Sequence, residues 1–204
     1  MIAVIDYGVG NLFSLTASLK YLGADVKVTG NPADLEDAGQ IILPGVGAFS
    51  DARQKLEESG LVDVIYRQVE KGKPMLGICL GMQLLFETSY EYGHHKGLGL
   101  VAGDIVSIEK DLTTPLKVPH IGWNQLKILV DDPLFKYIKN GEYVYYVHSY
   151  YGKNCEKDTI AVSEYDVSIT GAVRHGNVYG TQFHPEKSGA AGMNILRAFK
   201  EMKE

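Results

Sequence analysis

The chain has 204 residues, of which 45% are hydrophobic and 22% charged, and its formal net charge is −5. This size and composition predict one domain, residues 1–204, with a large buried core. The negative charge argues against nucleic-acid binding, and no apolar run approaches the ~20 residues that a membrane-spanning helix needs. The N-terminus enters an apolar run directly and the chain has two cysteines, so we expect no signal peptide, no disulfide framework and a cytoplasmic location.

The first half of the chain alternates short apolar runs with stretches at helical spacing. Residues 2–5 are all apolar, which is typical of a strand buried on both faces, and leucines recur at helical spacing over 12–22. Further strands are predicted at 26–28, 41–43 and 75–78, and helices at 48–70, with a break near Gly60, and at 80–86. Strands that alternate with helices predict an α/β fold with a parallel sheet.

The second half has a different pattern. Short alternating segments separated by turn residues occupy about 97–179, for example 143–147 and 159–162. They are typical of antiparallel strands, which we expect to extend the sheet. Residues 110–119 contain two prolines and are predicted to form a loop, and a last helix is predicted over 188–203.

A cysteine lies between two glycines where the fourth strand should turn into a helix, in Gly77-Ile78-Cys79-Leu80-Gly81. A G-x-C-x-G pattern at such a place has the layout of a nucleophile elbow, in which small neighbours allow a sharp, strained turn. The helix N-terminus would favour the Cys79 thiolate, and the Leu80 amide would face a developing oxyanion. A buried structural cysteine is the alternative, and the segment alone leaves both open.

A base for this thiol is suggested by the segment His184-Pro185-Glu186. In an extended chain residues i and i+2 face the same way, so His184 and Glu186 would project together. Such a pair suits a base and the carboxylate that orients it, as in Cys-His-acid enzymes. A surface His-Pro-Glu turn is the alternative.

A third feature, Pro44-Gly45-Val46-Gly47, follows the third strand. Its two glycines let the main chain approach a ligand closely, so it would suit a second oxyanion amide, and a plain strand-to-helix turn is the alternative. A dinucleotide-binding fingerprint is disfavoured because position 50 is Ser50. Elsewhere, His94-His95 has no ligands at metal spacing and is predicted to lie in a surface loop, and Cys155 is predicted to be an exposed loop thiol.

The P-G-x-G loop, the G-x-C-x-G elbow and the C-terminal H-P-E, in this order, resemble the class I (triad) glutamine amidotransferases. The resemblance covers almost the whole chain. It implies a flavodoxin-like three-layer fold, in which a parallel sheet carries added antiparallel strands. Within the family, the segments 77–83, 120–124, 147–150 and 183–188 are similar to the glutaminase subunits of imidazole glycerol phosphate synthases.

The resemblance implies a role for each matching residue. Cys79 would attack the glutamine side-chain amide, His184 would act as the base and then the acid, and Glu186 would orient His184. The oxyanion amides would come from Leu80, Val46 and Gly47, and the substrate contacts from Gln83, Gly47, Ser149 and Tyr150. Gln83 also follows Cys79 by one helical turn, which would place it in the same pocket, unless it is a solvated helix residue.

A partner is implied as well. In the family a (β/α)8-barrel cyclase subunit receives the ammonia and forms imidazole glycerol phosphate and an aminoimidazole carboxamide ribonucleotide in histidine biosynthesis. Neither a metal nor a cofactor is implied. Positions that lie near the interface in relatives are matched by Asn11, Trp123, Tyr145 and Lys187. Each has a plain structural alternative, namely a helix N-cap for Asn11, core or sheet-face packing for the two aromatic residues, and a solvated lysine.

Three other functions remain open. The first is another stand-alone glutaminase subunit, such as one that serves pyridoxal phosphate synthesis, although the segments 120–124 and 183–188 favour the histidine pathway. The second is a different Cys-His-acid hydrolase, such as a peptidase, against which Gln83 and the glycine loop argue. The third is a non-catalytic interaction subunit, which the intact set of Cys79, His184 and Glu186 disfavours.

Overall fold

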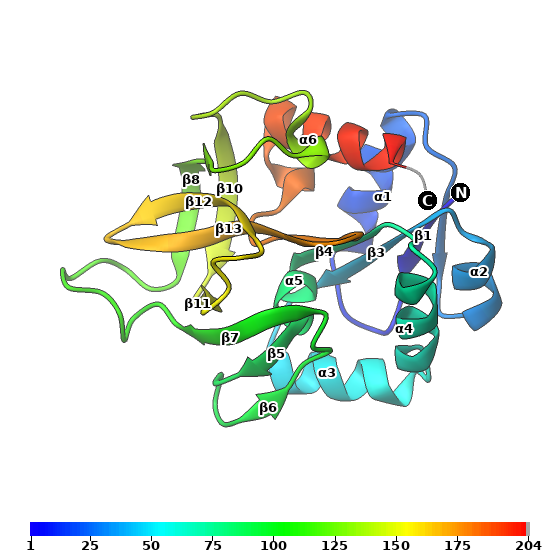
Figure 1. Cartoon of the computed structure of the whole chain (residues 1–204), viewed down its shortest axis with the longest axis horizontal. Coiled ribbons are helices and arrows are strands. Elements are labelled where there is room, and N and C mark those ends of the chain that lie inside the picture. The colour runs from blue at the N-terminus through cyan, green and yellow to red at the C-terminus, as the bar shows by residue number, and fades with distance from the viewer. Residues whose placement is uncertain (203–204) are drawn as a thin grey trace.

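The computed structural model describes residues 1–202, and an eight-stranded sheet of order β2-β1-β3-β4-β14-β13-β12-β9 runs through them (Figure 1). Its strands are β1 (Ile2–Ile5), β2 (Val26–Thr29), β3 (Gln40–Gly45), β4 (Met75–Cys79), β9 (Lys127–Ile128), β12 (Thr159–Tyr165), β13 (Val167–His175) and β14 (Val178–Thr181). The strands from β2 to β14 are parallel, whereas β13, β12 and β9 continue the sheet antiparallel. The predicted α/β fold, with a parallel sheet extended by antiparallel strands, is confirmed.

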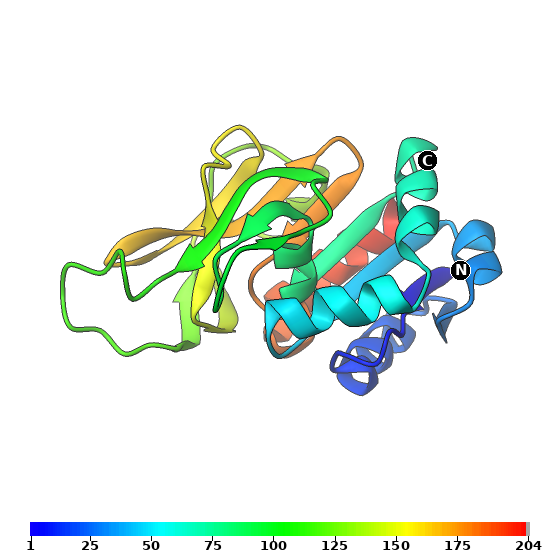
Figure 2. The same cartoon turned by 90° about the horizontal axis from the view of Figure 1, so that it is seen from below.

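Helices cover both faces of the parallel part (Figures 1 and 2). They are α1 (Leu12–Tyr21), α2 (Pro32–Asp37), α3 (Phe49–Glu58), α4 (Val62–Glu70), α5 (Leu80–Leu84) and α6 (Gly189–Glu201). Side chains of β1 alternate between two cores: Val4 packs in the core with α1 and α6, and Ile5 in the core with α2 to α5. Because both faces are covered, the strands need no polar face, which explains the uniformly apolar run at 2–5.

The predicted helix boundaries are mostly correct. The helix predicted over 48–70 is two helices that separate at Gly60, whose φ of +71° suits glycine. The helix predicted over 80–86 ends at Leu84, because Phe86 already begins the next strand. The helix predicted over 188–203 ends at Glu201, and Lys203 lies outside the described residues.

The remaining strands form two smaller sheets, so the expectation that all of them extend the central sheet is wrong. One sheet contains β11 (Tyr150–Lys153), β7 (Val101–Ser107), β5 (Phe86–Ser89) and β6 (His95–Lys96), and the other pairs β10 (Tyr143–His148) with β8 (His120–Gln125). We call this pair the β8–β10 ribbon. Its side chains alternate between buried and exposed, which suits a layer that covers a core with one face only. The predicted loop at 110–119 is confirmed.

The topology brings the sequence motifs to one edge of the sheet. Gly45, at the end of β3, pairs directly with Cys79, at the end of β4. The next strand, β14, pairs Thr181 with Ile78, so the chain leaves it toward His184 on the same side. The carboxyl ends of parallel strands are where open α/β sheets bind their ligands.

Candidate active site

The nucleophile elbow is built around a strained residue. Cys79 has φ 54° and ψ −112°, in a region that side chains rarely adopt, and α5 begins immediately after it. A Cβ on Gly81 would come within 1.8 Å of the Leu43 carbonyl oxygen, and one on Gly77 within 2.7 Å of the Gly81 carbonyl oxygen. The two glycines therefore let α5 pack directly on the main chain of β3 and β4, while Cys79 itself takes the unusual turn.

His184 and Glu186 are in contact, although not in the way the sequence predicts. The His184 Nδ1 lies 2.9 Å from the Glu186 Oε1, and both side chains are only 3% exposed. The backbone is not extended: His184 precedes a 3-10 turn at Pro185–Lys187, and this turn brings the two side chains together. The main chain of His184 is fixed by strand β10, because the Tyr145 carbonyl accepts a hydrogen bond from the His184 amide at 3.0 Å.

The charge of His184 is set by its neighbours. Burial acts to lower the pKa of this imidazole, but hydrogen bonds and charge interactions with Cys79 and Glu186 outweigh it and raise the pKa to about 9. The imidazolium form is therefore favoured beside the sulfur. Such a residue can hold the proton that the thiol gives up and release it later to a leaving group.

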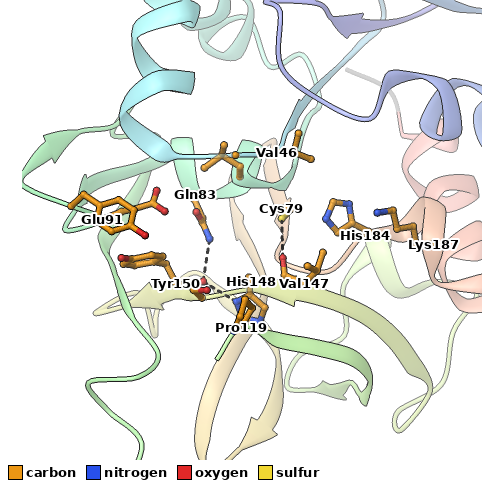
Figure 3. A pocket seen from close by; sticks show the side chains of 14 residues that line it. Val46, Cys79, Gln83, Glu91, Pro119, Val147, His148, Tyr150, His184 and Lys187 are labelled. Atoms are coloured by element: carbon orange, nitrogen blue, oxygen red, sulfur yellow. Dashed lines mark hydrogen bonds between the residues drawn. The ribbon is translucent and has the colours of Figure 1, made fainter. Parts of the chain in front are cut away.

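These groups open into one pocket of about 360 Å³ (Figure 3). Its lining residues are Val46, Gly47, Cys79, Leu80, Gln83, Glu91, Tyr92, Pro119, Val147, His148, Ser149, Tyr150, His184 and Lys187. Cys79 lies between His184 on one side and Gln83 on the other, with Glu91 at the far end. The pocket thus has a thiol and imidazole at one place and a carboxylate at another, an arrangement that suits a small bipolar ligand.

The predicted oxyanion groups lie beside the thiol. Leu80 is the first residue of α5, so its amide has no partner inside the helix. Val46 and Gly47 follow the end of β3, line the same pocket and are exposed, and Gly47 has φ +97°. The Tyr7 hydroxyl donates to the Pro44 carbonyl at 2.8 Å and so fixes the start of this loop.

The predicted substrate contacts form the opposite wall. Ser149 and Tyr150 lie where the chain leaves β10 and enters β11. Gln83 is buried rather than solvated, and its Nε2 donates to the Tyr150 carbonyl at 3.1 Å. With its amide hydrogens directed into the wall, Gln83 has its side-chain oxygen left for a ligand.

A neutral histidine pair lies under this wall. His120 and His148 are directly opposite in the β8–β10 ribbon, and their ring nitrogens are 3.0 Å apart. Burial lowers the pKa of His148 to about 3, and burial lowers that of His120 to about 4. The His148 Nδ1 lies 2.8 Å from the Tyr150 carbonyl, which can only accept, so this nitrogen is the donor. The pair therefore anchors the Tyr150 peptide.

Of the residues predicted near an interface, Lys187 lines the pocket, and Tyr145 is joined to it through the His184 amide. Trp123 is 54% exposed and contacts the Tyr145 ring, with centroids 5.9 Å apart, on the outer face of the β8–β10 ribbon. Lys187 is exposed at the rim of the pocket beside His184. Asn11 is the N-cap residue of α1, as its structural alternative expects, although its side chain makes no capping hydrogen bond within the described chain.

The sequence gives no sign of a role for Glu91 or Gln182, and one prediction outside the site is wrong. Glu91 lines the pocket and Gln182 contacts the Cys79 sulfur at 3.8 Å, and neither belongs to a local pattern that indicates a site. His120, from the segment 120–124, is joined to the pocket only through its contact with His148. Cys155 is buried, not exposed: its sulfur lies 3.4 Å from the Thr159 hydroxyl and 3.6 Å from that of Thr170. The turn at Asn154, with φ +59°, tucks Cys155 into the core.

Residues 1–202 contain neither a metal-binding cluster nor a membrane-spanning helix. Within this range no His, Cys, Asp or Glu side chains group in a way that would hold a metal ion. No helix in the same range is long and apolar enough to cross a membrane.

Comparison with known proteins extends this picture. The family model described as "Glutamine amidotransferase class-I" matches residues 3–202. The chain is 50% identical to "Imidazole glycerol phosphate synthase subunit HisH" of Caldanaerobacter subterraneus subsp. tengcongensis, over 99% of this chain and 98% of that protein. It is 48% identical to the protein of the same name from Listeria innocua, over 100% of this chain and 97% of that one.

Solved structures share the fold. The chain superposes on a crystal structure of a glutamine amidotransferase with a TM-score of 0.75 at 19% identity, over 98% of this chain and 97% of that one. It superposes on PurLQS from Thermotoga maritima with a TM-score of 0.75 at 21% identity, over 97% of this chain and 96% of that one. Since the family model matches nearly the whole length and relatives of about half-identical sequence align from end to end, the chain belongs to the class-I glutamine amidotransferase family.

Proposed function

We propose that this chain is the glutaminase subunit of an imidazole glycerol phosphate synthase, acting in histidine biosynthesis in the cytoplasm. It would hydrolyse glutamine to glutamate and ammonia. Relatives named as a subunit of that synthase, 46–50% identical over nearly the full length, support this assignment. The observation that carries it is the Cys79 thiol in a pocket beside the buried His184–Glu186 pair.

The first half of the reaction forms a thioester. The Cys79 sulfur attacks the side-chain amide carbon of glutamine, and its proton resides on His184. A C–S bond forms while the carbonyl π electrons move onto oxygen. The tetrahedral intermediate then expels the amide nitrogen, which takes the proton from His184 and leaves as ammonia, so that a glutamyl thioester remains on Cys79.

The second half restores the thiol. A water molecule attacks the thioester carbon and gives a proton to His184. The C–S bond breaks, glutamate leaves, and the proton on His184 balances the Cys79 thiolate. Glu186 accepts from the His184 Nδ1, which leaves the other ring nitrogen for the reacting atoms.

The negative oxygen of both intermediates would be stabilised by main-chain amides. The Leu80 amide begins α5 next to the sulfur, and the Val46 and Gly47 amides follow β3, whose last residue pairs with Cys79. Donors placed where charge develops in the transition state typically contribute about 10²–10³-fold to the rate.

The far end of the pocket suits the α-amino-acid part of glutamine. Glu91 is buried there, and its Oε2 accepts from the Phe49 amide, which orients the carboxyl group. An α-ammonium group would pair with this carboxylate, while the Ser149 and Tyr150 main chain and the Gln83 oxygen would hold the rest of the substrate. The pocket length between Glu91 and Cys79 would then place the side-chain amide at the sulfur.

The outer face of the β8–β10 ribbon suits a partner subunit. Ile121, Trp123 and Tyr143 are each more than half exposed on it, and the neighbouring Tyr145 carbonyl is bonded to the His184 amide. We propose that a (β/α)8-barrel cyclase subunit covers this face together with Asn11 and Lys187, and receives the ammonia to form imidazole glycerol phosphate and the aminoimidazole carboxamide ribonucleotide. Apolar aromatic patches of this kind commonly carry the energy of protein association.

A glutaminase assay tests the mechanism. Release of glutamate is measured for the chain alone and mixed with the cyclase subunit and its nucleotide ligand, and we expect weak turnover alone and strong stimulation in the complex. Cys79→Ala should abolish turnover, whereas Cys155→Ala, which removes the other thiol, should keep it. Turnover by Cys79→Ala would refute the mechanism, and equal activity with and without the partner would refute the coupling.

A binding measurement tests the partner face. Trp123→Ala should weaken binding of the cyclase subunit by about 30-fold, as expected for loss of an interface hot spot. Tyr21→Ala removes a similarly large aromatic side chain that is 85% exposed on α1 and should bind as the unchanged chain does. Equal affinities of both variants would place the partner elsewhere.

A further inference from the structure

A buried glutamine touches the nucleophile from inside the protein. Gln182 is 0% exposed, and its Nε2 lies 3.8 Å from the Cys79 sulfur. It follows β14 directly, and its main-chain amide donates to the Gly171 carbonyl at 2.8 Å, which fixes the start of the side chain. A fully buried side-chain amide needs hydrogen-bond partners for its nitrogen and its oxygen, and the Cys79 sulfur is a partner for the nitrogen.

The orientation of the Gln182 side-chain amide follows from its contact with Gln83, which in turn contacts the Tyr150 carbonyl. The Tyr150 carbonyl can only accept, so the Gln83 Nε2 at 3.1 Å must be the donor. The same Gln83 nitrogen lies 3.0 Å from the Gln182 side chain, which must therefore present its oxygen to Gln83. The Gln182 nitrogen is left facing the sulfur, and turning either amide over would bring two donors or two acceptors together.

The Tyr150 carbonyl is itself held from behind. It accepts from the His148 Nδ1 at 2.8 Å, and His148 is hydrogen-bonded to His120 at 3.0 Å. A series of hydrogen bonds therefore runs from the β8–β10 ribbon through Tyr150, Gln83 and Gln182 to Cys79. Each polar group in it has one possible direction.

We propose that Gln182 is a further catalytic residue of this site, whose side-chain N–H donates to the Cys79 sulfur and stabilises the thiolate. The thiolate is both the attacking group and the group that leaves when the thioester is hydrolysed, so the same hydrogen bond favours both half-reactions. Gln83 and the His148–His120 pair act through Gln182 and are positioning residues in this respect. The inference rests on the proposed function of Cys79 as the nucleophile.

The chemistry distinguishes this role from simple packing. A hydrogen bond to a charged acceptor is stronger than one to a neutral acceptor, so its loss acts on the thiolate and spares the thiol. Replacement of Gln182 by an apolar side chain of similar size would keep the packing and remove the donor. Replacement by glutamate would keep the shape and the acceptor for Gln83 but place an oxygen against the sulfur.

The test measures the reactivity of Cys79 directly. The full chain is alkylated with iodoacetamide from pH 5 to 9.5, and peptide mass spectrometry quantifies the label on Cys79 in Gln182→Met, Gln182→Glu and the unchanged chain. In Gln182→Met we expect about tenfold less thiolate at neutral pH, so that the midpoint of alkylation rises by about one pH unit. In Gln182→Glu we expect a larger rise. With the cyclase subunit present, kcat should fall by a similar factor in Gln182→Met, while KM for glutamine changes less than about twofold.

Gln68→Met is the matched control, because Gln68 is a 1% exposed glutamine on α4, away from the pocket, and should leave the alkylation profile unchanged. If Gln182→Met does not fold, as judged by thermal melting, Gln182→Glu decides the question because it keeps the contact with Gln83. Unchanged alkylation profiles in the folded variants would overturn the inference. Alkylation needs no glutamine turnover, so this result is independent of the Cys79→Ala assay that tests the proposed function.

Discussion

Two buried histidine sites in this molecule differ in charge, one being cationic and the other neutral. At the turn after β14, Glu186 and the Cys79 sulfur surround His184 and favour the imidazolium. In the β8–β10 ribbon, His120 and His148 contact each other, and their other neighbours are the Tyr150 carbonyl and aromatic rings. Burial keeps both histidines neutral. Burial alone lowers the pKa of a histidine, so an adjacent carboxylate and thiol decide which site holds a mobile proton.

The two sites also differ in what they contribute. A proton that can move on and off His184 is useful in a reaction, whereas the tautomers of His120 and His148 are fixed by the Tyr150 carbonyl, an acceptor at one end, and the Asn124 amide, a donor at the other. His184 therefore suits proton transfer, whereas the His120–His148 pair suits rigid positioning of the Tyr150 carbonyl. The variants below are arranged by expected size of effect, and each removes one of the features that separate the two sites.

His184→Gln should have the largest effect, a loss of about 10²–10⁴-fold in glutaminase kcat, because His184 is the imidazole beside the thiol, whereas the other imidazole of the pocket, His148, is bonded to the Tyr150 carbonyl. Glutamate release in the presence of the cyclase subunit measures it. Circular dichroism and thermal melting check that the variant is folded. A loss below about tenfold in a folded variant would contradict the role of His184.

Glu186→Gln should act on the same site through its charge. Glutamine at 186 still accepts from Nδ1 but no longer favours the imidazolium, so the pKa of His184 should fall from about 9. The expected result is a kcat lower by roughly 10–10²-fold and slower alkylation of Cys79 at pH 7. Unchanged alkylation would mean that Cys79 alone sets the charge of His184.

His148→Gln should act on stability instead. The pKa of His148 is about 3 in the folded chain, well below the ~6.5 of a free histidine, so the unfolded chain binds more protons as pH falls. Stability from this residue is complete above about pH 6.5 and is lost as pH falls toward 3. Glutamine cannot titrate, so between pH 6 and 4 the free energy of unfolding of the variant should fall by about 1.4 kcal/mol less per pH unit than that of the unchanged chain.

Urea unfolding at pH 7, 6, 5 and 4 measures that slope. His94→Gln serves as the control, since His94 is exposed, and it should follow the unchanged chain. If His148→Gln loses stability with pH as steeply as the control does, His148 is not neutral in the folded state.

Asn124→Ala should give the smallest effect. The Asn124 amide donates to the Glu164 carbonyl at 2.9 Å and lies 3.4 Å from the His120 Nε2, so its loss leaves an acceptor of the neutral pair unsatisfied. We expect a loss of about 1 kcal/mol in unfolding free energy. Asn140→Ala, which loses one hydrogen bond to the Ile128 amide on the surface, provides the comparison. A larger loss in the comparison variant would show that His120 does not depend on Asn124.

Local patterns predicted one of these sites and not the other. His184-Pro185-Glu186 is contiguous, so the pairing of its side chains was predictable, although a 3-10 turn and not an extended chain brings them together. His120 and His148 are 28 residues apart and meet only through the register of the β8–β10 ribbon. A sequence pattern specifies strands better than it specifies which strands pair.

The same difference between local patterns and strand pairing explains the other predictions, both correct and wrong. The apolar runs at 2–5, 41–43 and 75–78 predicted the parallel sheet, because strands covered on both faces leave no other pattern. Glu91 and Gln182 were not predicted, since the residues that they contact, Phe49 for Glu91 and Cys79 and Gln83 for Gln182, are distant in the sequence. Cys155 was predicted to be exposed because its polar neighbours in the sequence do not report the turn that buries it.

The backbone at the nucleophile has a consequence for directed evolution. Cys79 holds φ 54° and ψ −112°, a conformation that costs a side-chain-bearing residue on the order of 1–3 kcal/mol and that glycine adopts freely. Cys79→Gly would therefore relieve strain at the same step that removes the reactive sulfur. A library of this chain sorted for heat resistance alone would be enriched in inactive members, so any such selection must be coupled to growth on the product.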